Sequence, residues 1–77
     1  MIKLETRLRR ELQSIFNLEM DVTIKESGAL LILRVDFWRG ENKFTTSIEL
    51  TYNYLITKKD AVLKELSYNI IDKLIID

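Results

Sequence analysis

The chain contains no cysteine and no histidine. Without cysteine it has no disulfide, no thiol nucleophile and no thiolate metal site. Without histidine it lacks the commonest general base and the commonest ligand of transition metals. Because 77 residues are few for a domain that no disulfide or metal stabilises, the hydrophobic core has to supply the stability. Hydrophobic residues make up 47% of the chain, which is enough for such a core.

Proline is absent, glycine occurs only twice, and no repeat or low-complexity segment interrupts the chain. We therefore expect a single α+β domain over residues 1–77. No apolar run approaches the roughly 18 residues of a membrane span. The first residues also lack the apolar region of a signal peptide. Together with the missing cysteine, these features predict a cytoplasmic protein that binds no membrane.

An excess of charge of either sign is also missing, since 12 basic and 12 acidic residues give a net charge of zero. Proteins that bind the phosphate backbone usually carry an excess of lysine and arginine. The balance therefore argues against a general nucleic-acid binder, although a local basic patch stays possible. Nucleic acid is thus not the favoured partner.

Hydrophobic spacing predicts a helix at each end of the chain. The first helix is expected over residues 2–16, with one apolar stripe made of Leu4, Leu8, Leu12, Ile15 and Phe16. The second is expected from Thr57 to about residue 75, because the Thr57 hydroxyl could accept a hydrogen bond from the Asp60 N–H. The side chains expected to face the sheet from this helix are Val62, Leu63, Leu66, Ile70 and Leu74.

Between the helices, residues 20–54 predict two β-hairpins. A two-residue turn at Ser27-Gly28 would pair Ile24 with Leu31. A turn over residues 39–42 would pair Phe37 with Phe44. The expected fold is therefore αβββα, with a three-stranded antiparallel meander and both helices packed on one face of it.

The uncovered face of this sheet supplies the first candidate for a binding surface. Leu30, Ile32, Arg34 and Trp38 would point outward from the middle strand. Tryptophan and arginine often dominate the energetics of protein contacts. The alternative is local cover, in which Trp38 shields the second turn and stacks on Lys43 or Arg39.

The last helix supplies the second candidate. Tyr68, Ile71 and Ile75 follow Lys64 at spacings of four, three and four residues, which defines an apolar ridge distinct from the core stripe. Such a ridge is typical of a helix that pairs with a partner or with a second copy of the chain. Alternatively, the helix lies between the first helix and the sheet and buries both sides.

Basic residues gather at Arg7, Arg10, Lys58 and Lys59. The order αβββα and the string Thr57-Lys58-Lys59-Asp60-Ala61 resemble double-stranded RNA-binding domains, whose last helix opens with Ser-Lys-Lys-x-Ala. This resemblance implies that the first helix, the first hairpin loop and these lysines contact two minor grooves and the phosphates between them. The first loop departs from the family, because it lacks the Gly-Pro-x-His pattern.

Catalytic patterns are absent from the sequence. Asp36 and Glu49 could approach each other on the open face, but a flat sheet offers no cleft that would shift their pKa values. We therefore expect no enzyme, no catalytic residue, no cofactor, no bound metal and no small-molecule ligand.

The sequence thus favours a small non-enzymatic protein that acts through protein–protein contacts. Its size and composition are typical of phage and mobile-element proteins, some of which inhibit or regulate a host protein. The alternatives are a nucleic-acid-binding module with the topology of a double-stranded RNA-binding domain, and a self-associating structural protein such as a homodimer.

Overall fold

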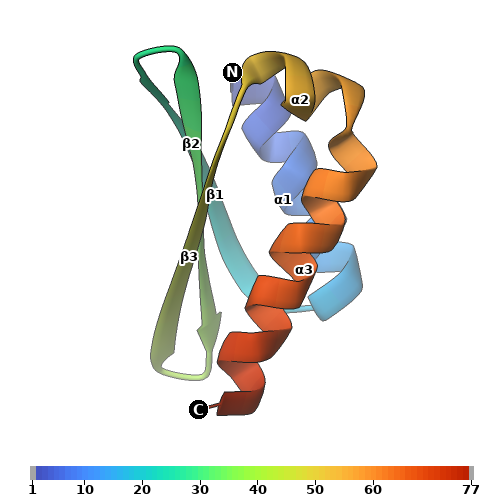
Figure 1. The fold of residues 1–77 in the computed structure, drawn as a ribbon. Coiled ribbons are helices and arrows are strands. Elements are labelled where there is room, and N and C mark those ends of the chain that lie inside the picture. Colours follow the sequence, from blue (N-terminus) through green and yellow to red (C-terminus); the bar gives the residue numbers. More distant parts are fainter. Residues whose placement is uncertain (1, 77) are drawn as a thin grey trace.

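The computed structural model describes residues 2–76, so Met1 and Asp77 of the expected domain lie outside the described residues. In chain order the elements are α1 (Ile2–Phe16), β1 (Glu19–Ser27), β2 (Leu30–Arg39), β3 (Asn42–Leu50), α2 (Tyr52–Thr57) and α3 (Lys59–Ile76). The strands form one antiparallel sheet in the order β1-β2-β3. The predicted αβββα meander is confirmed, with the short α2 as an addition. Figure 1 shows α1 and α3 on the same face of the sheet.

Helix α1 has the predicted bounds, and its stripe is confirmed except at one residue. Leu8 and Leu12 are fully buried, whereas Ile15 is 58% exposed. Phe16, four residues after Leu12, continues the stripe and packs against the core. The helix ends where Asn17 adopts a positive φ of 55° and its N–H donates to the Gln13 carbonyl at 2.8 Å. Asparagine tolerates this left-handed conformation better than most residues do.

The second hairpin has the predicted register. Phe37 pairs with Phe44, and their rings stack with centroids 5.2 Å apart. The two-residue turn between β2 and β3 begins with Gly40 at φ 64°. A positive φ at the first turn position is what a type II′ turn requires, and glycine adopts it without strain.

The predicted register of the first hairpin is wrong by two residues. Ile24 pairs with Leu33 rather than Leu31, because the turn is Gly28-Ala29 and not Ser27-Gly28. Gly28, with φ 64°, occupies the first turn position instead of the second. Since side chains alternate with a period of two, this shift leaves each residue of β1 on its expected face.

The predicted start of the last helix is also wrong. Thr51, not Thr57, caps a helix: its side chain accepts from the Tyr54 N–H at 3.1 Å and begins α2. Thr57 instead ends α2, and its hydroxyl donates to the Asn53 carbonyl at 2.7 Å. Lys58 separates α2 from α3 with a backbone that is not helical (φ −122°, ψ 40°).

The core lies between the sheet and the two long helices. The predicted inner face of α3 is confirmed, since Val62, Leu66 and Ile70 are buried and Leu63 and Leu74 pack against them. Helix α1 contacts β1 and helix α3 contacts β3, so each edge strand has its own helix. The buried apolar side chains are Leu8, Leu12, Met20, Leu31, Leu33, Val35, Phe37, Phe44, Leu50, Leu55, Val62, Leu66 and Ile70.

Candidate protein-binding surfaces

The four predicted residues of the open face lie together on the outer side of β2, as expected. Trp38 is half-buried, and Lys43 of β3 places its Nζ 5.7 Å from the centroid of the indole. Arg34 is tied to Asp36 by a 3.2 Å contact between Nε and Oδ1. Trp38 and Arg34 are thus occupied within the sheet, which supports the local-cover interpretation for Trp38.

Ile32 and Leu30 continue this face toward the first turn. Ile32 is half-buried and lies opposite Lys25 on one side and Glu49 on the other, while Leu30 is just exposed. A hollow of about 430 Å³ crosses the face here, lined by Thr23, Lys25, Ile32, Arg34 and Asp36. Four of its five lining residues carry polar or charged groups, while apolar atoms, including those of Ile32, form most of its wall.

On the open face, the carboxylate of Asp36 interacts with the charges of Arg34 and Lys43. Partial burial raises the pKa of this carboxyl, while hydrogen bonds from the Thr45 hydroxyl and from Arg34 lower it. The charges of Arg34 and Lys43 act in the same direction, so the pKa of Asp36 lies below its usual range. The Thr45 hydroxyl donates to Oδ1 at 2.7 Å. The carboxylate is therefore held in its ionised form, unlike a general acid.

The predicted ridge on α3 is exposed. Tyr68 is 57% exposed, Ile71 39% and Ile75 76%. They lie on the side of α3 opposite the buried Leu66 and Ile70, and Lys64 is exposed with them. The alternative in which α3 buries both sides is therefore wrong.

Helix α2 contributes an apolar surface that sequence reasoning missed. Tyr52, Tyr54 and Ile56 are exposed, while only Leu55 of this helix is buried. The segment was not predicted as a helix because aromatic and β-branched residues have weak helix propensity. Its one sequence signal is Thr51, a good N-cap residue directly after the last strand.

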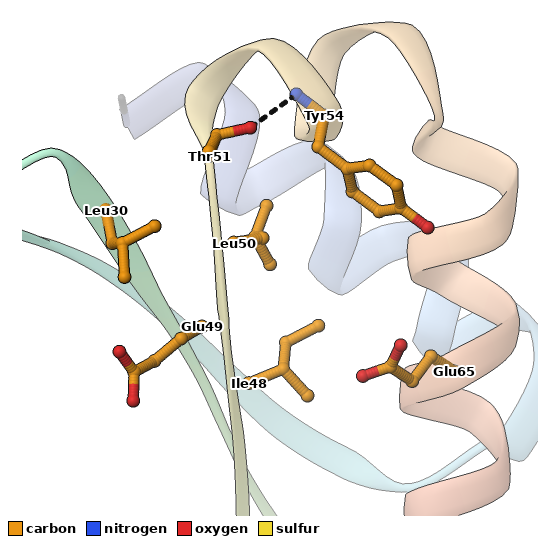
Figure 2. A pocket seen from close by; sticks show the side chains of 7 residues that line it. All are labelled: Leu30, Ile48, Glu49, Leu50, Thr51, Tyr54 and Glu65. Atoms are coloured by element: carbon orange, nitrogen blue, oxygen red, sulfur yellow. Dashed lines mark hydrogen bonds between the residues drawn. The ribbon is translucent and has the colours of Figure 1, made fainter.

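A second hollow, of about 330 Å³, opens where β3 meets α2 and α3, and its lining residues are Leu30, Ile48, Glu49, Leu50, Thr51, Tyr54 and Glu65. Figure 2 shows Ile48 and Leu50 on the helix side of the strand and Leu30 and Glu49 on its other side. The hollow therefore extends around the edge of β3 and is not an enclosed pocket. It offers apolar walls, two carboxylates, and the hydroxyl-bearing residues Thr51 and Tyr54.

Of the four basic residues predicted to contact nucleic acid, three are exposed and the fourth, Lys59, forms an ion pair within the protein. Arg7, Arg10 and Lys58 are exposed. Lys59 contacts Glu11 of α1, with 3.0 Å between Nζ and Oε1, and so joins the two long helices. An ion pair within the protein leaves Lys59 less able to neutralise a phosphate.

Within residues 2–76, no helix has both the length and the apolar character that crossing a membrane requires. In the same part of the chain, no three carboxylate side chains gather as a metal site would need. No protein-family model matches the chain, and no curated protein and no solved structure is significantly similar to it.

Proposed function

We propose that the protein is a non-enzymatic binding protein that acts through protein–protein contacts made by the ridge of Tyr68, Ile71 and Ile75. The exposure of these three side chains on one side of α3 is the observation that carries the proposal. Contiguous apolar surface of this kind marks interaction sites more often than ordinary protein surface.

The ridge has the chemistry of a helix-pairing seam. Its members recur at three and four residues, the spacing with which one helix docks its side chains against another. Tyr68 adds a hydroxyl at the rim of an apolar contact, a combination common in protein interfaces. A chain of this size would act by occluding a surface of a larger protein, as small inhibitors from phages and mobile elements do.

Site-specific photo-crosslinking in the cells that produce the protein tests this proposal. A photoreactive phenylalanine analogue replaces Tyr68, and a matched control carries it in place of Lys25, which is exposed on the open face. We expect a discrete adduct, heavier than a crosslinked homodimer, from position 68 only. The adduct should disappear in the Ile71→Glu/Ile75→Glu variant.

Three outcomes would reject the ridge as the binding surface. These are no adduct from position 68, an equal adduct from position 25, or an adduct that contains only two copies of the chain. Circular dichroism of the double variant serves as the folding control, because both replaced side chains are exposed.

Nucleic-acid binding is the second candidate, favoured by one observation: both long helices cover one face of an αβββα sheet, as in double-stranded RNA-binding domains. The exposed Arg7, Arg10 and Lys58 would contact phosphates. It ranks second because Lys59 is paired with Glu11 and the net charge is zero. A gel shift with duplex RNA at low salt tests it, since low salt strengthens phosphate contacts and absence of a shift there would exclude it.

A further inference from the structure

Strand β3 is an edge of the sheet, with β2 on one side and no strand on the other. In an antiparallel ladder, the N–H and C=O of every second residue point away from the partner strand. The β2–β3 hairpin is closed by the pair Arg39–Asn42, which is the hydrogen-bonded pair next to a two-residue turn. Counting from this pair, the residues whose backbone groups point outward are Lys43, Thr45, Ser47 and Glu49.

The opposite edge of the sheet, β1, follows the same alternation. Counting from the closing pair Ser27–Leu30, it directs the Ile24 N–H away from β2. That N–H is found donating to Oε2 of Glu5, on α1, at 2.6 Å. Among residues 2–76, no side chain makes a comparable hydrogen bond to the backbone of Asn42–Leu50. The β1 edge is thus covered at Ile24, whereas the β3 edge is open.

The sequence of β3 is complementary to itself when the strand is reversed. With a two-fold axis at Thr46, Lys43 of one copy lies opposite the partner's Glu49, and the reverse pair forms at the other end. Phe44 then lies opposite the partner's Ile48, and Thr45 opposite the partner's Ser47. Across the two strands, each charged side chain therefore lies opposite a side chain of opposite charge. Each apolar side chain lies opposite an apolar one, and each hydroxyl opposite a hydroxyl.

Neighbouring registers lose this match. Moving the axis to Thr45 places Lys43 opposite the partner's Ser47 and Glu49 opposite the partner's Glu41. Moving it to Ser47 places Lys43 opposite the partner's Thr51. Of these three axes, only the one at Thr46 places Lys43 of each copy opposite a carboxylate of the other copy.

We propose that two copies of this chain pair β3 with β3 in antiparallel orientation about a two-fold axis at Thr46, which joins their sheets into one. The pairing also brings the partner's Asn42 opposite Leu50, one of the residues that line the hollow in Figure 2. A net charge of zero creates no general repulsion between the copies. This interface lies on the sheet edge and does not depend on the proposed role of the ridge on α3.

Sedimentation equilibrium over a wide concentration range, combined with a charge swap, tests the proposal. We expect a dimer for the wild type, and Lys43→Glu and Glu49→Lys should each raise the dimer dissociation constant about tenfold, because each turns two attractive pairs into repulsive ones. The double variant Lys43→Glu/Glu49→Lys restores the pairs with reversed sign and should return the constant to within a few-fold of the wild type.

A backbone variant tests the same interface without charge. Ser47→Pro removes an N–H that points outward and makes no bond to β2, so circular dichroism should stay native while the protein becomes monomeric. Ser47→Ala is the matched control and should remain dimeric. A wild type that is monomeric at millimolar concentration would overturn the proposal. So would a dimer that ignores the charge variants or dissociates in the Ile71→Glu/Ile75→Glu variant, since the interface would then lie elsewhere.

Discussion

Strands β1 and β3 are both edges of one sheet, but they are protected to different degrees. Helix α1 packs along β1, and Glu5 accepts the hydrogen bond that the outward N–H of Ile24 would otherwise lack. Helix α3 packs over β3 without making such a bond to the strand. Covering an edge is a common way to prevent unwanted strand pairing, and an uncovered β3 edge is what the proposed pairing of two copies requires.

On the open face of the sheet, the side chains of β2 also have different neighbours on β3 and on β1. On the β3 side, Thr45 donates to Asp36 and Lys43 lies over the ring of Trp38. On the β1 side, Asp36 faces another carboxylate, Asp21. Within residues 2–76, the polar and cation–π side-chain contacts of the central strand therefore reach the open edge strand β3 and not β1.

The largest effect on stability is expected from removing Glu5, the side chain that covers the β1 edge at Ile24. Glu5→Ala leaves the Ile24 N–H without its acceptor and should lower the free energy of unfolding by about 1–3 kcal/mol. Urea denaturation measures the loss, and amide exchange by NMR should show faster exchange at Ile24. Glu5→Gln keeps an acceptor oxygen and should lose less. Unchanged protection of Ile24 would show that the hydrogen bond does not cover this edge.

A smaller, pH-dependent effect is expected at Asp36. Its pKa is lower in the folded protein than in the unfolded chain, so its charge stabilises the fold at neutral pH, and this contribution is lost as the pH falls below about 4. Asp36→Asn should therefore be less stable than the wild type by about 0.5–1.5 kcal/mol at pH 7, with the gap closing in acid. Urea midpoints of both proteins at several pH values measure this, and a gap that persists in acid would contradict it.

The smallest effect concerns the like-charged pair between β1 and β2. Asp21→Asn removes the carboxylate opposite Asp36 and should stabilise the protein by about 0.2–1 kcal/mol at pH 7. The matched control is the same substitution in the Asp36→Asn background, where the gain should vanish. If the gain is equal in both backgrounds, the two carboxylates do not interact.

Patterns that repeat along the chain predicted most of the fold. The stripe of α1, the inner face of α3 and the second hairpin all depend on side-chain periodicity, which is visible in the sequence. The first register was wrong because it depends on which turn position Gly28 occupies, and sequence alone permitted both. The last helix was wrong at its start because Thr51 and Thr57 are both plausible caps, and only the course of the backbone distinguishes them.

The candidate surfaces were predicted unevenly. The ridge of Tyr68, Ile71 and Ile75 was found from spacing, and its exposure agrees with that reasoning. The open edge could not be found in this way. Recognising it requires the contact between Glu5 and Ile24, which are 19 residues apart, and such tertiary contacts leave no periodic signal.

The meander has a further consequence for how the chain folds. Each strand pairs only with its neighbour in sequence through a two-residue turn, so both hairpins can form by closing short loops. Docking of the terminal helices is then the main long-range step. Because proline is absent, no slow prolyl isomerisation interrupts this process. The order of the elements therefore favours rapid folding in a single kinetic phase, so that the β3 edge is presented by a folded chain rather than by a slowly maturing intermediate.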